Sequence, residues 1–317
     1  GGLTIRNRAV MSPMGTDLAD IRGNATPRLI AYYTERAKGG IGLIINEYTG
    51  VDDVDSIPTQ HNLRMAQDYN VQEAEELTRS VHAYGAKIFA QLHHGGATSK
   101  SAFTGRQNLS PSGVPMAPGG EVPREMTLED IKRVQEKFIA AAVRCKKAGY
   151  DGVELHGAHS YLIAQFFSKY YNHRTDAYGG SLENRLRFAR EVVEEIKSRC
   201  GQDFPVALRF SVKSMIKDWR EGALPGEEFE EKGRDLEEGL QAAKLLVEYG
   251  YDALDTDVGT YDAWWWNHPP MYQKKGLYRP YCKMVKEAVD VPVLCAGRMD
   301  DPDMALEALE NGECDII

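Results

Sequence analysis

One short stretch, KAGYDGVEL at residues 147–155, shows the pattern that organises the whole chain. An amphipathic helix ends at a glycine, and a short apolar run follows within about three residues. Glycine suits this place because it adopts a left-handed backbone without a Cβ clash. The same arrangement recurs in four other stretches: AKGGIGLII (37–45), AYGAKIFAQL (83–92), EYGYDALDT (248–256) and ENGECDII (310–317).

Three further apolar runs complete a set of eight predicted strands: RNRAVMSP near the start of the chain, PVALRFS from Pro205 and PVLCAG from Pro292. Near-continuous apolar strands that alternate with helices are typical of a parallel sheet covered by helices. Eight such units predict an α/β fold closed into a (β/α)₈ TIM barrel, with the eighth unit truncated. An open doubly wound sheet is the competing architecture. The first predicted strand is not followed by GxGxxG, so the sequence gives no support for Rossmann-type dinucleotide binding.

We expect residues 1–317 to form one barrel domain, because barrels of about 200 to 250 residues or more fold as single domains. The first predicted strand starts almost at residue 1 and the eighth stops at Ile317, so we expect the chain to be cut at both ends. Barrels frequently build a phosphate site from the loops after strands 7 and 8. Half of such a site would then lie beyond Ile317.

The composition argues against several classes of function. Hydrophobic residues make up 42% and charged residues 27% of the chain, as in a globular protein. The net charge of −9 without a basic stretch argues against nucleic acid as a partner. No apolar run reaches the roughly 20 residues of a membrane span, and no export leader is recognisable. Five cysteines without a CxxC pair argue against disulfides and structural zinc, and fit a reducing cytoplasm. Nothing in the composition argues against a homo-oligomer.

Polar residues follow seven of the predicted strands at their carboxyl ends, where barrels of this kind hold their active sites. Burying polar groups is costly unless they serve one another or a ligand, so a ligand is the simpler explanation. These residues are 12–16, Asn46, Glu47, Gln91, His93, His94, His156, His159, Arg209, Asp255, Asp257, Gly297 and Arg298.

Several of these residues also have a purely structural interpretation. Gln91 could satisfy backbone groups, and Arg209 could form an internal ion pair with a carboxylate such as Asp255. His156 and His159 could be core histidines. The functional interpretation of Arg209 is a fixed cation beside a cofactor on which negative charge develops.

A long motif at residues 152–188 carries a family resemblance. It combines His156, His159 and Tyr161 with an R-x-D-x-Y-G-G-S-x-E-N-R string at residues 174–185. NRAVMSPMGT from Asn7, QLHHGG from Gln91, ALRFS and CAGRM extend the match over essentially the whole chain. These motifs resemble the Old Yellow Enzyme family of flavin oxidoreductases.

Within that family, residues 254–278 resemble the branch of 2-enoate reductases, 2,4-dienoyl-CoA reductases and bile-acid or steroid oxidoreductases. Members of this branch often continue into a 4Fe-4S iron–sulfur segment and a domain that binds FAD and NAD(P)H. The resemblance leaves the exact substrate open.

The resemblance implies FMN as the cofactor and NAD(P)H as the electron donor. Gln91 is implied to hydrogen-bond the flavin pyrimidine, Arg209 to face N1 and O2, and Gly297 with Arg298 to hold the phosphate. The other implied flavin contacts are Pro13, Met14, Gly15, Thr16 and Tyr48. The implied activity is ene-reduction, in which hydride passes from flavin N5 to the β-carbon of an α,β-unsaturated carbonyl compound. The substrate would be a small molecule such as an enoate, an enoyl-CoA or a 3-oxo-4-ene steroid.

His156 and His159 are implied to donate hydrogen bonds to the substrate carbonyl, and Tyr161 to protonate the α-carbon. The structural alternative for Tyr161 is a tyrosine that caps a loop at a helix start. Trp264, Trp265 and Trp266 would line an apolar substrate pocket or serve loop packing.

Two residues depart from the family pattern: Ser160 replaces the usual glycine, and Tyr48 stands where a small residue often lies. The long segment 94–126 is either a lid or a static flap.

Other functions compete with this one. The same scaffold run oxidatively would be an amine dehydrogenase or a steroid or bile-acid desaturase. A metal-dependent hydrolase could use His93, His94, His156, His159 and Asp255, but the usual HxH pair of the first strand is missing, and we assign no metal. A flavin-binding barrel without catalysis is the third alternative.

Overall fold

The computed structural model describes residues 2–116 and 119–317, and it divides into two compact units. The first comprises Gly1–His156 and Glu191–Val206, and the second Gly157–Arg190 and Ala207–Ile317. The single domain expected from the sequence stays a prediction.

The first unit is built on parallel strands in the order β1, β2, β3, β6. Val10 lies opposite Leu43, Leu43 opposite Lys87, and Phe89 opposite Gly152. The last three strands are buried almost throughout, as their apolar sequences predict. Their bounds are β1 (Val10–Met11), β2 (Leu43–Gly50), β3 (Lys87–His93) and β6 (Gly152–Gly157).

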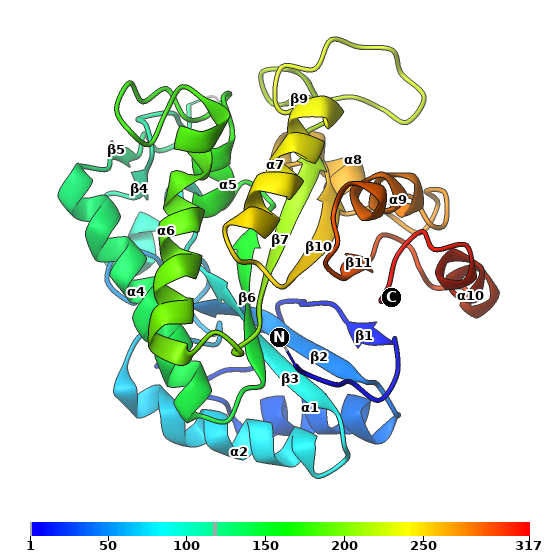
Figure 1. The fold of residues 1–317 in the computed structure, drawn as a ribbon. Helices are drawn as coiled ribbons and strands as arrows, with labels where there is room; N and C mark the ends of the chain where they lie inside the picture. The colour runs from blue at the N-terminus through cyan, green and yellow to red at the C-terminus, as the bar shows by residue number, and fades with distance from the viewer. Residues whose placement is uncertain (1, 117–118) are drawn as a thin grey trace. The chain divides into compact units, whose positions relative to one another are not determined.

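Three helices pack beside these strands in the first unit, as Figure 1 shows: α1 (Pro27–Lys38), α2 (Val71–His82) and α4 (Leu128–Lys147). Thr26 caps α1 by accepting a hydrogen bond from the Leu29 N–H, and Thr127 with Asp130 forms a capping box on α4. The shorter elements are η1 (Asp68–Asn70), η2 (Gly96–Thr98), α3 (Ser101–Thr104), β4 (Leu109–Ser110) and β5 (Arg124–Glu125).

The second unit contains the parallel strands β7 (Val206–Lys213), β10 (Ala253–Val258) and β11 (Val293–Cys295). Leu254 of β10 lies opposite Leu208 on one side and Val293 on the other. The longer helices are α7 (Leu236–Glu248), α9 (Arg279–Ala288) and α10 (Pro302–Glu310), and α6 (Leu182–Cys200) runs through parts of both units. The short elements are α5 (Leu162–Phe167), β8 (Ile216–Asp218), β9 (Glu221–Gly222), η3 (Tyr261–Ala263) and α8 (Trp264–Asn267).

The glycine punctuation seen in the sequence has the predicted backbone conformation. Its five glycines all have positive φ: +98° at Gly40, +76° at Gly85, +83° at Gly149, +109° at Gly250 and +65° at Gly312. Seven of the eight predicted strands are present, and the eighth is reduced to an isolated bridge between Ile316 and Leu294.

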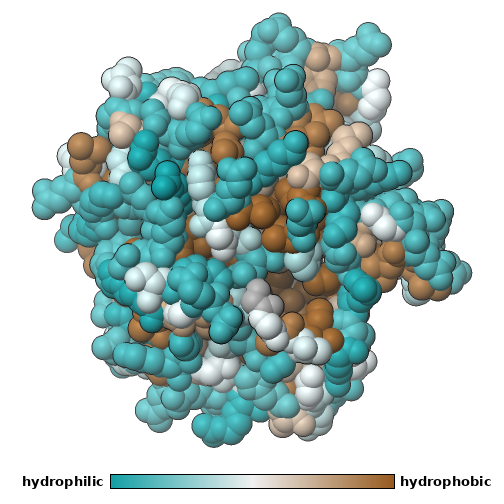
Figure 2. Space-filling model, viewed as in Figure 1, coloured by the Kyte–Doolittle hydropathy of each residue, from teal (hydrophilic) through white to brown (hydrophobic). Residues whose placement is uncertain are grey.

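The surface visible in Figure 2 is mainly hydrophilic, with apolar side chains in scattered groups. Within the described part of the chain, none of the helices combines the length and the apolar character that crossing a bilayer requires.

Candidate active site

In the first unit, Glu47 of β2 holds the loop that follows β1. The pairing of β2 with β3 shifts register between Asn46 and Tyr48, so Glu47 is an extra residue in its strand. Such a bulge re-aims a side chain. The Glu47 carboxylate accepts hydrogen bonds from the Thr16 N–H (2.9 Å) and from the Thr16 hydroxyl. Burial raises the pKa of Glu47, and the bonds from Thr16 oppose that rise.

Gly15 of the same loop lies against the Tyr48 ring. A Cβ at Gly15 would come within 2.4 Å of Tyr48 Cε1, so the large residue at position 48 occupies the space that a side chain at position 15 would need. The Tyr48 ring centroid lies 5.2 Å from that of His93, which lies 5.7 Å from that of His156. Predicted residues Gly15, Tyr48 and His156 thus belong to one connected group. Pro13 and Met14 lie on the same loop, and Met14 is half exposed.

Gln91 contacts a residue that we did not single out from the sequence. Its side-chain N–H donates to Glu154 Oε1 at 2.8 Å, and both residues are buried on neighbouring strands. The strand register places Gln91 directly opposite Glu154. A glutamate inside the otherwise apolar run GVEL was the sequence signal for this partner.

His159 and Ser160, in the second unit, form a strained turn between β6 and α5. Their φ values are +55° and +56°, in the left-handed region that favours glycine. This geometry explains why the family usually has glycine at position 160. Ser160 is held there by two contacts: its hydroxyl accepts from the Tyr261 N–H (3.2 Å), and its carbonyl accepts from the Gln165 side chain (2.7 Å).

Arg209 forms the internal ion pair that we considered from the sequence, mainly with Asp257. Its Nε and Nη2 donate to Asp257 Oδ2 at 2.9 and 2.6 Å, whereas its Nη1 lies 3.5 Å from Asp255. His159 Nε2 lies 2.8 Å from the same Asp257 oxygen. All four side chains therefore form one cluster of the second unit, in which Asp255 and Asp257 are fully buried.

Tyr161 starts α5 and makes no side-chain capping bond there, so the structural alternative of a capping tyrosine is not what the geometry shows. Its hydroxyl instead forms a short hydrogen bond with the Tyr261 hydroxyl, and the two rings lie edge to face at 5.5 Å. Burial and the neighbouring Tyr261 raise the pKa of Tyr161 above its ordinary value. The phenol is therefore protonated at neutral pH.

The three predicted pocket tryptophans have different surroundings. Trp264 is 52% exposed, stacks on His268 at 4.2 Å and lies 5.4 Å from Tyr261. Trp265 is also exposed, whereas Trp266 is buried and its indole N–H donates to the Ala223 carbonyl. Only Trp264 therefore adjoins the aromatic rings around Tyr161.

Gly297 and Arg298 both have positive φ after β11. A Cβ at Gly297 would lie 2.5 Å from the Tyr278 ring, which requires glycine there. The Arg298 guanidinium donates to the carbonyls of Pro270 (3.0 Å) and Gln273 (2.9 Å), so in this structure it holds the preceding loop.

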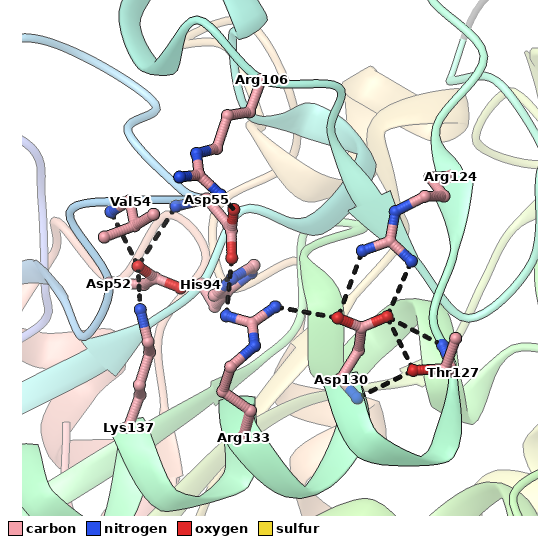
Figure 3. A network of polar contacts seen from close by, with 10 residues as sticks. All are labelled: Asp52, Val54, Asp55, His94, Arg106, Arg124, Thr127, Asp130, Arg133 and Lys137. Carbon is pink, nitrogen blue, oxygen red and sulfur yellow. Dashed lines mark hydrogen bonds and ion pairs between the residues drawn. The ribbon is translucent and has the colours of Figure 1, made fainter.

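The segment 94–126 is tied to α4 by the charged network of Figure 3. Arg124 donates to Asp130 at 2.7 Å, and Arg133 bridges Asp130 and Asp55. Arg106 lies 3.8 Å from the same Asp55. Both alternatives for this segment, a lid and a static flap, stay predictions.

The donor groups of the predicted flavin residues suit FMN. The Gln91 amide can donate and accept hydrogen bonds and the Arg209 guanidinium can donate them, as the carbonyl and imide groups of a flavin require. Among residues 2–116 and 119–317, no three His, Cys, Asp or Glu side chains are grouped so that they could hold a metal ion.

Comparisons with known proteins agree with this arrangement. Residues 1–317 match the model of the NADH:flavin oxidoreductase / NADH oxidase family. Cinnamate reductase of Clostridium sporogenes is 51% identical over 100% of the chain and 49% of the relative, and NADH oxidase of Thermoanaerobacter brockii is 41% identical over 100% and 47%. The structure of an Old Yellow Enzyme homologue from Zymomonas mobilis is 29% identical with a TM-score of 0.82, covering 100% of this chain and 85% of that one.

Fold and relatives together define an α/β-barrel oxidoreductase. The chain belongs to the NADH:flavin oxidoreductase / NADH oxidase family. The predicted resemblance to the Old Yellow Enzyme family and its enoate reductase branch is confirmed. The chain spans about half the length of the two curated relatives named above.

Proposed function

We propose that this chain is the catalytic part of an FMN-dependent ene-reductase that uses NAD(P)H and reduces the C=C bond of small 2-enoates. The observation that carries the proposal is the pairing of Tyr161 with His159 on one strand-to-helix turn, their ring centroids 6.2 Å apart. A phenol held in its protonated form is a suitable general acid, and an imidazole beside it can bind the carbonyl oxygen.

Tyr161 donates its hydroxyl proton to the α-carbon of the substrate, and the hydroxyl of Tyr261 remains hydrogen-bonded to the resulting phenolate. His156 and His159 bind the substrate carbonyl or carboxylate oxygen, which draws electron density away from the β-carbon. FMN, when bound, supplies the hydride to that carbon. These roles are supported by the burial of Tyr161, by its bond to Tyr261 and by the match of residues 1–317 to the family.

The flavin contacts that the family resemblance implies are proposed for each unit by itself. Gln91 is oriented by Glu154 and would bond the pyrimidine edge, while the loop of Pro13, Met14, Gly15 and Thr16, anchored by Glu47, would line another edge beside Tyr48. Arg209 would supply positive charge near N1 and O2, and Gly297 with Arg298 would approach the phosphate.

An aryl-substituted enoate is the substrate that the aromatic residues favour. Tyr261, Trp264 and His268 present ring faces close to Tyr161, and aromatic rings prefer to pack against one another. A relative that is 51% identical to this chain is named cinnamate reductase, and cinnamate is an aryl-substituted enoate.

The proposal is tested on the purified full-length protein by absorbance spectroscopy. We expect flavin bands that bleach when NADH or NADPH is added without oxygen and return when cinnamate is added. Enoyl-CoAs and 3-oxo-4-ene steroids are the comparison substrates. A protein that cannot take up FMN would refute the cofactor. Oxidised flavin bands that bleach on addition of a saturated acid, amine or steroid, in a protein whose reduced flavin is not reoxidised by enoates, would favour the oxidative alternative.

We also propose, from the branch resemblance, that the full-length protein carries a 4Fe-4S segment and an FAD domain that deliver electrons from NAD(P)H. Iron and acid-labile sulfide analysis, with separation of FMN and FAD, tests this. A cytoplasmic location stays a prediction.

A further inference from the structure

Asp257 lies at the centre of the buried cluster in the second unit. Its Oδ2 accepts hydrogen bonds from Nε (2.9 Å) and Nη2 (2.6 Å) of Arg209, and lies 2.8 Å from Nε2 of His159. Its Oδ1 accepts the backbone N–H of Val258 at 2.7 Å. Both carboxylate oxygens are therefore occupied, and the side chain is wholly removed from solvent.

The charge on Asp257 decides which nitrogen of His159 carries hydrogen. Burial by itself raises the pKa of Asp257, but Arg209 and His159 outweigh burial and hold that pKa below its ordinary value. An ionised carboxylate only accepts hydrogen bonds. The contact at 2.8 Å therefore requires hydrogen on Nε2 of His159.

We propose that Asp257 is a positioning residue that keeps the hydrogen of His159 on Nε2 and holds the Arg209 guanidinium in one orientation. A neutral His159 then carries a lone pair on Nδ1, and it donates from Nδ1 only as an imidazolium. Where His159 binds a substrate oxygen, a step that rests on the proposed function, it acts as a cation whose charge Asp257 balances. A cationic donor matches the negative charge of an enoate carboxylate better than a neutral one does.

Asp255 offers a matched control on the same strand, two residues away. It lies 3.5 Å from Arg209, and within the described part of the chain neither of its carboxylate oxygens accepts a hydrogen bond. Burial and the nearby Asp257 raise its pKa, against the opposing effect of Arg209. A substitution by asparagine at Asp255 leaves the partner of His159 in place, whereas at Asp257 it removes that partner.

The test is ¹⁵N NMR of the full-length protein labelled at histidine, without added substrate, with the His159 signal assigned from its loss in His159→Asn. The proposal requires that His159 is the Nε2–H tautomer or the imidazolium. We expect a neutral Nδ1–H form to become populated in Asp257→Asn but not in Asp255→Asn. A neutral Nδ1–H form in the unaltered protein overturns the proposal even if Asp257→Asn fails to fold, and so does an unchanged tautomer in a folded Asp257→Asn protein.

Steady-state kinetics with cinnamate then tests the part that depends on the proposed function. We expect Asp257→Asn to raise KM by about tenfold, because a charge-assisted hydrogen bond is roughly twice as strong as a neutral one. An unchanged KM would reject the cationic donor. A full-length protein that never reduces enoates, yet shows the predicted tautomers, would refute the proposed function and leave the positioning role of Asp257 intact.

Discussion

At the scale of single residues, the chemistry of the site depends on how each side chain is held. Tyr161 is buried beside a second phenol, and both features favour its protonated form. Arg209 and His159 share one carboxylate oxygen of Asp257, so the two side chains are held by the same acceptor. The proton donor and the oxygen-binding group therefore lie on one turn but have different electrostatic surroundings. Tyr161 faces a neutral phenol, whereas His159 faces a carboxylate.

Tyr161→Phe removes the proposed general acid and little else. We expect the rate of cinnamate reduction to fall by about 10² or more, the usual size of a general acid–base contribution. Reduction of the bound flavin by NAD(P)H should stay close to that of the unaltered protein, because it needs no proton from Tyr161. Stopped-flow measurement of each half-reaction separates the two, and an unchanged rate of alkene reduction would exclude Tyr161 as the proton donor.

The pH dependence follows from the same residue. Because its pKa is raised above the ordinary value of about 10, Tyr161 keeps its proton as pH rises through neutral and mildly alkaline values. The rate of alkene reduction in a single turnover should therefore show no loss that is due to this group between about pH 6 and pH 9. A decline in that range that disappears in Tyr161→Phe would contradict the raised pKa.

At the scale of elements, two local distortions place the site residues. One is the left-handed turn at His159 and Ser160, and the other is the bulge of β2 at Glu47. Neither follows from the regular repeat of a strand or a helix. Each is held by side-chain contacts to a distant segment.

Two substitutions at Ser160 separate strain from hydrogen bonding. Both Ser160→Ala and Ser160→Gly lose the hydroxyl that accepts the Tyr261 N–H, but only glycine relieves the positive φ. We expect the glycine variant to be more stable than the alanine variant by about 1 kcal/mol. Urea unfolding of the two variants measures the difference. An alanine variant at least as stable as the glycine variant would show that the turn is not strained.

Glu47→Ala should loosen the loop of residues 12–17. It leaves the Thr16 N–H and hydroxyl without their acceptor, at a cost of about 1 to 3 kcal/mol in unfolding free energy. Under the proposed function, FMN affinity should fall with it. Glu47→Gln is the matched control, because its amide keeps one oxygen that can accept a hydrogen bond from Thr16. Flavin retention on gel filtration and urea unfolding provide the readouts.

At the scale of the whole molecule, buried ion pairs make stability depend on pH. Burial alone would raise the pKa of Asp52, but His94 and Lys137 outweigh it and hold the pKa well below its ordinary value (Figure 3). A carboxylate whose pKa is lower in the folded than in the unfolded protein stabilises the folded state. This stabilisation is fully present above the pKa in the unfolded protein, about 4, and is lost as the pH falls below that pKa.

Asp52→Asn should therefore lower the unfolding free energy at pH 7 by about 3 kcal/mol, because it leaves Lys137 and His94 without the charge that they face. The loss should shrink as the pH falls below about 4, where the unaltered protein loses the same contribution. Urea unfolding of both proteins across this range gives the two pH profiles. If the unfolding free energies of the two proteins changed in parallel with pH, Asp52 would not be the source of this pH dependence.

The amino-acid sequence by itself determined the order of the elements and the family. Short apolar runs, four of them directly after a glycine, predicted seven strands that the structure contains, because burial on both faces and helix termination are local requirements that each segment meets on its own. The motif with His156, His159 and Tyr161 identified the family, because its spacing is written directly in the chain.

Only the tertiary structure decided which groups those residues contact. The bulge at Glu47, the bond from Gln91 to Glu154, the Tyr161–Tyr261 pair and the sharing of Asp257 all join residues far apart in sequence, and such contacts depend on strand register and on the packing of distant loops.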